Sequence, residues 1–319
     1  MDFRKLALAA ILAASSAASF AQYPNKPVHA IISFTPGSST DIVGRVVMQK
    51  VSEYWGQPII ADNRAGAGGS IGTAAVLRSP PDGYTLLIDS SGHAVTPSIY
   101  ASLPYDTLKD FIDVVPFAVQ PNVLVVAANS RFKTLMDIVN EARAKPGSIN
   151  FGSAGVGSGT HLNLERFVAA AGIKVTHIPF KGTPEVVTNI LGGSVDCYWA
   201  PISAALSNIK SGKLRALAVS TAKRKSSLPD TPTTGEAGIS GADSPLWFGL
   251  WTAAGTPPEI VQKISVDVRK ALADPGVKEK LANLGNDTMD MSPEEFARFV
   301  REEMETYAAV IKAAGIKPQ

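Results

Sequence analysis

The chain has 319 residues, a formal net charge of +2 at pH 7, four histidines and one cysteine. A charge so close to zero argues against a surface that binds nucleic acid or an anionic membrane. The single cysteine, Cys197, rules out an intramolecular disulfide, and we expect it to be a small buried thiol.

The first 21 residues have the pattern of a secretory signal peptide rather than of a buried helix. Arg4 and Lys5 precede the apolar run Leu6–Ala14, and Ser19-Phe20-Ala21 has the form of a cleavage site. The apolar run is too short to span a bilayer, and no later stretch reaches the length of a membrane helix. We therefore expect export to the periplasm and cleavage after Ala21.

A strand, a loop of small residues and a helix follow one another near the start of the mature chain. The apolar run His29–Phe34 has strand length and breaks at Pro36-Gly37. The next helix would have Thr40 or a neighbouring serine as its N-cap and Asp41 in its first turn. Such a helix end presents unpaired N–H groups to an anion. The alternative is an ordinary βα turn capped by a serine.

The rest of the chain alternates β-branched runs with helical stretches. Strands are predicted at Pro58–Ala61, Tyr84–Ile88, Val123–Ala127, Ile149–Phe151, Val175–Ile178, Val195–Trp199 and Leu214–Val219. Helices are predicted at Ser70–Leu77, Thr134–Ala144, Thr160–Ala171, Pro184–Leu191 and Ser203–Ser211. This alternation predicts an α/β fold with parallel sheets, in which ligands bind beyond the carboxyl ends of the strands.

Two long apolar runs predict that the chain passes twice between two domains. Phe111–Ala128 is interrupted by Pro116 and Pro121 and is too long for one compact strand. A matching run, Leu246–Trp251, follows a loop rich in proline, glycine and serine. A discontinuous first domain with the second inserted in it would have these crossings. The predicted bounds are 22–121 plus 246–319 for the first domain and 122–245 for the second.

The end of the chain is predicted to be helical. Pro257-Pro258 would open one helix, whose apolar residues are spaced by four along one face. Ser292 would cap another, with Pro293 at its first position and Glu295 completing a capping box. We expect both helices to serve packing rather than chemistry.

The chain lacks the common catalytic and cofactor signatures. Its histidines show neither HExxH nor metal-ligand spacing, and there is no GxSxG motif. The glycine-rich stretches Gly66–Gly72 and Gly152–Thr160 both miss GxGxxG and the lysine of a P-loop. We therefore expect no catalytic residues, no metal and no cofactor, and an exported enzyme stays only a remote alternative.

A second loop of small residues, Gly152–His161, leads from a predicted strand into a predicted helix. Its glycines let the backbone approach a ligand closely, and Ser153, Ser158 and Thr160 offer hydroxyls. A binding loop is favoured over a flexible linker by this placement. His161 would cap or orient the loop rather than touch the ligand.

Other candidates lie at the same predicted end of the strands. The loop after Ile88 offers the hydroxyls of Ser90 and Ser91 and the imidazole of His93. Lys181 either pairs with an anionic ligand or faces solvent, and Asp196 either holds a ligand group or caps a loop. Apolar walls, or alternatively parts of the core, are expected from Phe34, Trp199 and Trp247.

Ordered motifs run through nearly the whole mature chain. They are Tyr23–Val28, Phe34-x-Pro36-Gly37-x-x-x-Asp41-x-x-Gly44-Arg45, Asp62-Asn63-Arg64-x-Gly66-Ala67-Gly68-Gly69, Pro81–Leu87, Leu103–Asp106, Lys109–Phe111, Gly152-Ser153-x-Gly155-x-Gly157-Ser158-x-x-His161-Leu162, Pro179–Gly182 and Leu191-Gly192-Gly193-x-Val195-Asp196. Together they resemble the Bug family, the receptors of tripartite tricarboxylate transporters.

The resemblance implies a two-domain periplasmic binding protein of the Venus flytrap kind, similar to type II, with its ligand in the interdomain cleft. It implies a small organic carboxylate as ligand, held partly through the first loop and bridging waters. It also implies integral membrane subunits of a tripartite transporter as partners, with a signalling membrane protein as the alternative. A monomer is expected.

The two loops and the resemblance together predict the ligand-binding residues. They are Phe34, Thr35, Pro36, Gly37, Ser38, Ser39, Thr40 and Asp41, then Ser90, Ser91 and His93, then Ser153, Ala154, Gly155, Val156, Gly157, Ser158, Thr160 and His161, with Phe180, Lys181, Asp196 and Ala200.

The sequence departs from the family pattern in three places. Gly37-Ser38 stands where two glycines are common, Ala65 where proline is usual, and Phe180 where tyrosine is usual. The last change removes one possible hydrogen bond to a ligand. Phe180 and the tryptophans favour a ligand with an apolar or aromatic body, so a dicarboxylate or an aromatic carboxylate is expected.

Overall fold

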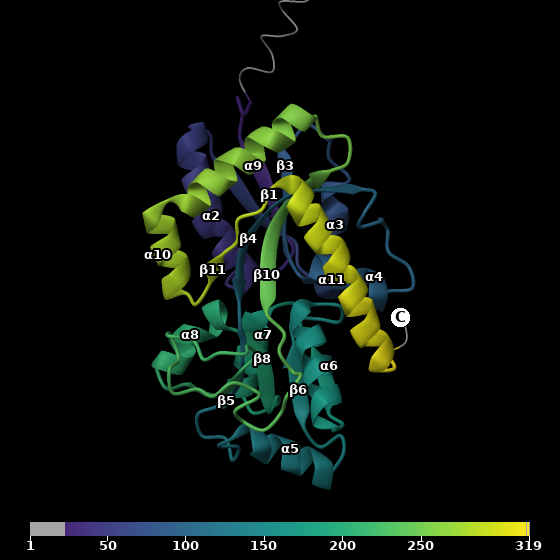
Figure 1. Cartoon of the computed structure of the whole chain (residues 1–319), viewed down its shortest axis with the longest axis vertical. Coiled ribbons are helices and arrows are strands. Elements are labelled where there is room, and N and C mark those ends of the chain that lie inside the picture. The colour runs from purple at the N-terminus through teal and green to yellow at the C-terminus, as the bar shows by residue number, and fades with distance from the viewer. Residues whose placement is uncertain (1–22, 317, 319) are drawn as a thin grey trace, which may run out of the picture.

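The protein is described here by a computed structural model that covers residues 23–316 and 318. The predicted signal peptide and its cleavage site lie outside these residues. Two sheets with flanking helices follow one another along the longest axis of the molecule (Figure 1), and we call each sheet with its helices a lobe. Within the described ranges, every helix is too short or too polar to cross a membrane.

The first sheet has six strands in the order β11-β4-β10-β3-β1-β2. Their bounds are β1 Val28–Ile32, β2 Ile59–Asn63, β3 Thr85–Ser90, β4 Phe111–Gln120, β10 Leu246–Ala253 and β11 Asp287–Thr288. Strands β1, β2 and β3 are parallel, whereas β10 is antiparallel to both β3 and β4.

The second sheet has five strands in the order β7-β6-β8-β5-β9. Their bounds are β5 Asn122–Ala127, β6 Asn150–Ser153, β7 Thr176–Pro179, β8 Cys197–Pro201 and β9 Leu214–Val219. Strand β6 is parallel to β7 and β8, whereas β5 is antiparallel to β8 and β9. The expectation of parallel sheets is therefore corrected to mixed sheets. One reason is that the chain leaves the first sheet on β4 and returns on β10, so these neighbours must run in opposite directions.

Helices cover both faces of the first sheet. Helices α2, α9 and α10 pack on one face and α3, α4 and α11 on the other. Their bounds, with those of the second lobe, are α2 Ser39–Trp55, α3 Ser70–Val76, α4 Gly92–Ile99, α5 Leu135–Ala144, α6 Gly159–Ala171, α7 Thr183–Leu191, α8 Ile202–Lys210, α9 Pro258–Ala273, α10 Pro275–Asn283 and α11 Pro293–Ala313, with a 3₁₀ turn η1 at Ala67–Gly69.

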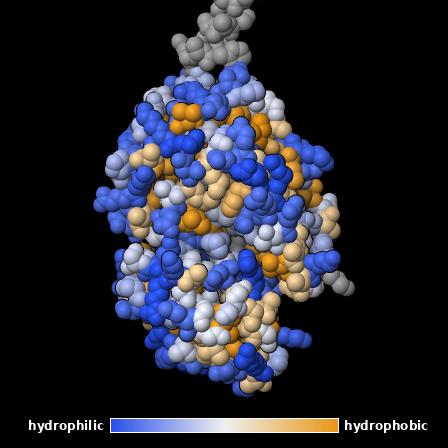
Figure 2. Space-filling model, viewed as in Figure 1, coloured by the Kyte–Doolittle hydropathy of each residue, from blue (hydrophilic) through white to orange (hydrophobic). Residues whose placement is uncertain are grey.

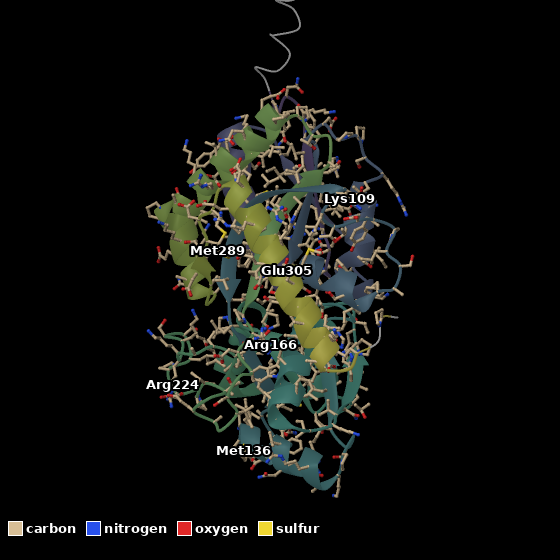
Figure 3. The ribbon with its side chains drawn as sticks, turned by 45° about the vertical axis from the view of Figure 1, so that its right-hand side comes forward. Lys109, Met136, Arg166, Arg224, Met289 and Glu305 are labelled. Carbon is tan, nitrogen blue, oxygen red and sulfur yellow. The ribbon has the colours of Figure 1, made fainter. Side chains whose placement is uncertain are left out.

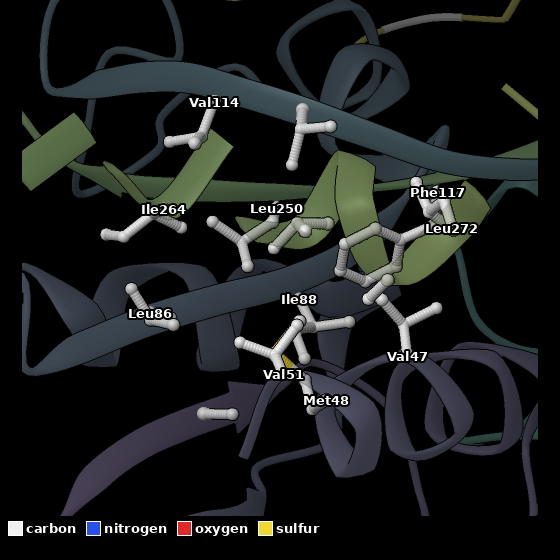
Figure 4. Packing of buried hydrophobic residues seen from close by; sticks show 14 of the residues in the cluster. Val47, Met48, Val51, Leu86, Ile88, Val114, Phe117, Leu250, Ile264 and Leu272 are labelled. Atoms are coloured by element: carbon white, nitrogen blue, oxygen red, sulfur yellow. The ribbon is translucent and has the colours of Figure 1, made fainter. Parts of the chain in front are cut away.

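The core of the first lobe forms where α2 meets the sheet. Val43, Val47 and Val51 recur every four residues, so they share one face of the helix. All three are fully buried, and they join Leu86 and Ile88 of β3 in one cluster (Figure 4). This apolar face thus fixes how the helix lies on the sheet.

The predicted crossings between the lobes are confirmed as chain paths. The first apolar run divides at Pro121 into β4 of one sheet and β5 of the other, and β10 carries the return. The crossings are tied together where they meet: the Asn122 side chain donates to the Ser244 carbonyl (3.1 Å), and its N–H donates to the Ser220 hydroxyl (2.9 Å). This short segment is our candidate hinge, and the domain bounds on either side stay predictions.

The last helix, α11, begins as predicted and reaches across to the second lobe. The Ser292 hydroxyl accepts the N–H of Glu295 (3.2 Å), and the Glu295 carboxylate accepts the N–H of Ser292 (2.8 Å), which confirms the capping box. Further along, α11 contacts α6, where Arg166 lies beside its lower half (Figure 3).

We expect Phe296→Ala to lower the free energy of unfolding by about 3–5 kcal/mol, because it leaves a cavity in a packed aromatic cluster. Phe296 is fully buried, with its ring centroid 5.8 Å from that of Trp247 and 5.3 Å from that of Trp251. Urea unfolding followed by tryptophan fluorescence measures the loss. Arg298→Ala, at an exposed position of the same helix, is the control and should change stability by less than about 0.5 kcal/mol.

The surface gives no sign of a single large apolar patch on the face in view. Figure 2 shows apolar side chains scattered among hydrophilic ones over both lobes, which is ordinary for a folded protein. Cys197 is fully buried and free, as predicted.

Candidate ligand-binding site

A small cavity lies between the carboxyl ends of the strands of the two sheets. It holds about 250 Å³ not filled by protein atoms, of which only about 10 Å³ is open to the centre of a water molecule, so it has room for about one water. Its lining residues come from both lobes: Phe34, Ser38, Ser39, Thr40, Ser90, Ala154, Ser158, Gly159, Thr160, Thr183, Pro201 and Leu246. The lobes are thus closed on one another here.

A larger space than this cavity lies elsewhere on the first lobe. A surface groove between α2 and the edge strand β2 offers about 530 Å³ to water. Its lining includes the small residues Ala30, Gly44 and Ala61. No helix begins in this groove, whereas helix N-termini converge on the small cavity. Convergent donors are the better indicator of a ligand site, so we place the site between the lobes.

The first of these helix ends belongs to α2. Ile42 is the first residue of the helix whose N–H bonds back, to the Ser38 carbonyl at 2.9 Å. Ser38 stands at the N-cap but makes no side-chain cap, and its hydroxyl lies instead 3.0 Å from that of Thr35. Within the described chain, the N–H groups of residues 39–41 therefore remain available to donate to a ligand.

Asp41 shapes this loop from behind. Its carboxylate accepts the N–H of Gly37 (2.9 Å), Nε of Arg45 (2.7 Å) and the amide of Asn63 (2.9 Å), and the same Asn63 amide also reaches the Phe34 carbonyl (2.9 Å). With its oxygens so engaged, Asp41 fixes the loop geometry and does not line the cavity. Pro36 and Gly37 are exposed at its rim.

The second helix end belongs to α6. The Ser158 hydroxyl accepts the N–H of His161 (3.2 Å) and lies 3.0 Å from the Thr160 hydroxyl, which in turn accepts the N–H of Ala154 (2.9 Å). Leu162 is the first residue of the helix whose N–H donates to a backbone carbonyl, that of Ser158. Within the described chain, the N–H groups of Gly159 and Thr160 are left for a ligand.

His161 acts on the loop from the side, as its position in the first turn suggested. Its Nδ1 accepts the N–H of Gly157 (3.3 Å), its Nε2 lies 3.4 Å from a carboxylate oxygen of Glu165, and its ring stacks on that of His177. His161 is therefore placed to orient the loop. Ser153 is fully buried behind the loop, with its hydroxyl 2.6 Å from Nε2 of His177.

A third helix end, that of α7, was missed by the sequence analysis. Thr183 opens this helix and lines the cavity, and its hydroxyl lies 3.0 Å from that of the buried Tyr198. A signal was available, because Pro179–Gly182 joins a strand to a helix with a proline in its first turn. The other lining residues that were not predicted are Gly159, Pro201 and Leu246.

The neighbouring helix α8 shows why an open helix end is informative. It begins close by, but the N–H of Ser203 donates to the side chain of Gln120 (3.0 Å) and that of Ile202 to the Pro121 carbonyl (3.2 Å). Its first donors are therefore satisfied within the protein. In the described chain, the N–H groups of residues 39–41 in α2, of Gly159 and Thr160 in α6 and of Thr183 in α7 have no such partners.

The lobes touch through glycines on both sides of the cavity. A Cβ atom at Gly182 would lie 2.0 Å from Oγ1 of Thr35, and one at Gly68 would lie 2.2 Å from the carbonyl oxygen of Val156. The Tyr100 hydroxyl also crosses between the lobes to that carbonyl, at 3.0 Å. Only residues without a side chain let the two backbones come this close.

The structure places His93 away from the cavity. Strand β3 runs on to Ser90 and α4 begins at Gly92, so the expected loop is a single connecting residue, and the helix directs His93 into the core. Its ring centroid lies 4.7 Å from that of Trp251 and 5.1 Å from that of Phe111. Burial lowers the pKa of His93 to about 3, so the imidazole is neutral. Ser90 does line the cavity.

Asp196 also lies elsewhere, just before β8 and thus at the opposite end of this strand from the cavity-lining Pro201. Its carboxylate accepts the N–H of Asn150 (2.8 Å). Of the two roles expected for Asp196, the structure therefore fits the capping of a loop. Phe180 and Lys181 line a shallow surface groove with Gly155 and Val156. The remaining predicted residues, Ser91 and Ala200, are buried beside lining residues.

The walls of the cavity carry hydroxyls, helix ends and apolar surface, but no charged side chain. Phe34, Pro201 and Leu246 supply the apolar part, whereas Trp199 and Trp247 are buried in the core. Backbone N–H groups at helix N-termini stabilise a negative charge without a cationic side chain. This arrangement suits an anion with an apolar body.

A family model described as the tripartite tricarboxylate transporter family receptor matches residues 43–316. The chain belongs to this family. The matched region includes strands of both sheets and the open ends of α6 and α7, whereas the open end of α2, at residues 39–41, lies just before it.

Solved structures of similar proteins share the fold of this receptor. The periplasmic binding protein BugD is 30% identical, with a TM-score of 0.89 over 93% of this chain and 100% of its own. An R. palustris protein solved with adipate is 32% identical, with the same TM-score and coverage. MatC from Rhodopseudomonas palustris, with bound malate, is 29% identical, with a TM-score of 0.86 over 91% of this chain and 100% of its own.

The family and these neighbours confirm the expected two-lobed α/β fold of a periplasmic binding protein. They are receptors and binding proteins rather than enzymes, and the receptor is therefore a periplasmic solute-binding protein of the Bug kind.

Proposed function

We propose that this receptor captures a small organic carboxylate between its lobes and delivers it to the membrane subunits of a tripartite transporter. The observation that carries the proposal is the convergence of α2, α6 and α7, with unpaired N–H groups, on a cavity that has no charged wall. Support also comes from the similar proteins solved with adipate and malate, both of which are dicarboxylates.

The arrangement of the helix ends favours a ligand with two carboxylates. Helix α2 belongs to the first lobe, whereas α6 and α7 belong to the second, so the donors face the cavity from both sides. One carboxylate on each side would satisfy both sets, and the hydrocarbon between them would contact Phe34, Pro201 and Leu246. An aromatic carboxylate, held by one side only, is the second choice.

Binding requires the lobes to separate, because the closed cavity has room for little more than one water. We infer that the lobes move about the segment where Asn122, Ser220 and Ser244 are hydrogen-bonded. The ligand would enter the open form and hold the lobes together through the helix ends. Closure would also create the surface that the membrane subunits bind.

A thermal-shift screen of residues 22–319 tests the proposal. The panel contains succinate, malate, adipate, citrate, glutamate, benzoate and phthalate. A ligand that binds only the folded protein adds about 2.7 kcal/mol of stability at a hundredfold excess over its Kd, and the melting temperature should rise by about 5 °C. Sodium chloride at matched ionic strength is the control. No shift with any acid, from folded protein free of copurified ligand, would overturn the carboxylate assignment.

A further inference from the structure

Asp89 is a buried carboxyl group directly behind the cavity. It lies one residue before the lining residue Ser90, near the carboxyl end of β3, and only 1% of its surface is exposed. Its Oδ1 accepts the N–H of Ser90 at 2.6 Å. A Cβ atom at Gly69, in the turn η1 that touches the second lobe, would lie 3.1 Å from its Oδ2. Asp89 thus adjoins both the ligand site and the lobe contact.

Hydrogen-bond counting around Asp89 leaves a place for a proton. The Thr73 hydroxyl lies 3.1 Å from Oδ2 of Asp89 and 3.2 Å from the carbonyl oxygen of Gly69. Thr73 has one hydroxyl hydrogen and cannot donate fully to both acceptors. If Oδ2 carries a proton, Asp89 donates to Thr73 and Thr73 donates to Gly69, so every oxygen is satisfied.

No cation neutralises Asp89 among the described residues. Ser33 faces it from the residue after β1, Thr73 from α3 and Gly249 from β10, and all three are uncharged. Among the described residues, the titratable group with which Asp89 interacts is the Tyr105 hydroxyl, which is itself buried. Burial, opposed by hydrogen bonds from neutral groups only, raises the pKa of Asp89 to about 7.

We propose that Asp89 is a proton-binding site, and that the receptor takes up its carboxylate ligand together with one proton on Asp89. The inference rests on the proposed function, because it needs an anion in the cavity beside Ser90. An anion there and an ionised Asp89 would repel one another across a poorly solvated wall. Protonation of Asp89 removes the repulsion, so the ligand and the proton favour each other's binding.

The sign of the pH dependence follows from linkage. Below pH 6 Asp89 is protonated in the free receptor and in the complex, so the contribution of Asp89 to affinity is highest and constant. As the pH rises through 7, the free receptor loses the proton while the complex retains it, and affinity falls by at most tenfold per pH unit. We expect Kd to rise about tenfold between pH 6 and pH 9, which corresponds to a pKa about one unit higher in the complex.

The Asp89→Asn substitution removes the titratable carboxyl group and keeps the shape of the side chain. Its amide oxygen can accept the N–H of Ser90, and its NH₂ group can donate to Thr73. We expect this variant to bind with a Kd that stays constant from pH 6 to pH 9. The matched control is Asp113→Asn, which replaces a partly buried carboxylate of β4 that is held by the Trp251 indole at 2.6 Å, away from the cavity lining. It should keep the wild-type pH dependence.

The closing experiment is isothermal titration calorimetry with the acid that gives the largest thermal shift in the screen, with adipate as the first probe. Titrations at pH 7.5 in phosphate and in Tris separate protons taken up by the protein from the heat of binding, because the buffers differ in ionisation enthalpy. We expect uptake of about half a proton or more per ligand by the wild type and none by Asp89→Asn.

The outcomes are distinct. A carboxylate that binds without proton uptake, or with uptake that persists in Asp89→Asn, overturns the role of Asp89 and leaves the proposed function standing. If every acid of the panel fails to bind to folded protein, the proposed function is overturned and this inference with it. Should Asp89→Asn fail to fold, the proton count of the wild type, with Asp113→Asn beside it, still decides for or against uptake.

Discussion

Ser38→Glu is expected to weaken carboxylate binding by about 1,000-fold or more while the protein stays folded. Ser38 stands at the N-cap of α2, is 3% exposed and lines the cavity. A glutamate there would put its own carboxylate where we expect that of the ligand. Two like charges about 4 Å apart repel by roughly 4 kcal/mol at an effective dielectric constant of about 20, which gives the expected factor.

Calorimetry with adipate or the best acid of the screen measures this loss, and Ser38→Ala is the matched control. Alanine removes the hydroxyl contact with Thr35 but leaves the backbone donors of α2, so it should cost about tenfold or less. A glutamate is favourable at a helix N-terminus, and thermal unfolding should confirm that Ser38→Glu folds. Equal affinity of Ser38→Glu and the wild type would mean that the ligand does not use the end of α2.

Gly182→Ala should weaken binding by about 100-fold, because it blocks closure and not folding. The backbone at Gly182 is extended, with φ at 177°, so alanine costs nothing there in the separated lobe. In the closed form its Cβ would lie 2.0 Å from Oγ1 of Thr35 and 2.5 Å from Oγ of Ser38. The lobes must then stay apart, and the ligand loses the donors of one side, about 2.8 kcal/mol.

Small-angle scattering with and without ligand, together with calorimetry, measures this effect. The wild type should become more compact on binding, and Gly182→Ala should not. Gly235→Ala is the control, since it adds the same methyl group at an exposed site where the nearest atom is 3.8 Å away. Adding Thr35→Ala to Gly182→Ala should restore part of the affinity. Compaction of Gly182→Ala equal to that of the wild type would show that this contact does not limit closure.

The sequence alone was sufficient for the elements whose signals are local. The strand–loop–helix units at the start of α2 and α6 follow from short apolar runs, small polar residues and capping residues within about ten positions. The capping box of α11 is local in the same way, whereas of the two prolines in the first apolar run only Pro121 separates two strands and Pro116 lies inside β4. These signals act within the chain segment itself, so they survive whatever packs around it.

The tertiary structure decided which side chains meet. His93 and Ser90 are three residues apart, yet one lies in the aromatic core and the other in the cavity wall, because α4 begins between them. Asp196 was expected near the ligand and lies at the far end of its strand. Such outcomes depend on strand order and on where each strand ends, and these are set by pairing with distant segments.

The sequence predicted some of the residues of the site but not all of them. Hydroxyls and glycines indicated two of the three open helix ends. The end of α7 had a weaker sequence signal, a proline in its first turn, and its part in the site was seen only when the structure placed Thr183 beside Thr160 and Ser38. The role that we propose for Asp89 could not be read from the sequence at all. It depends on burial without a nearby cation, a property of everything packed around the carboxyl group and not of the residues beside it in the chain.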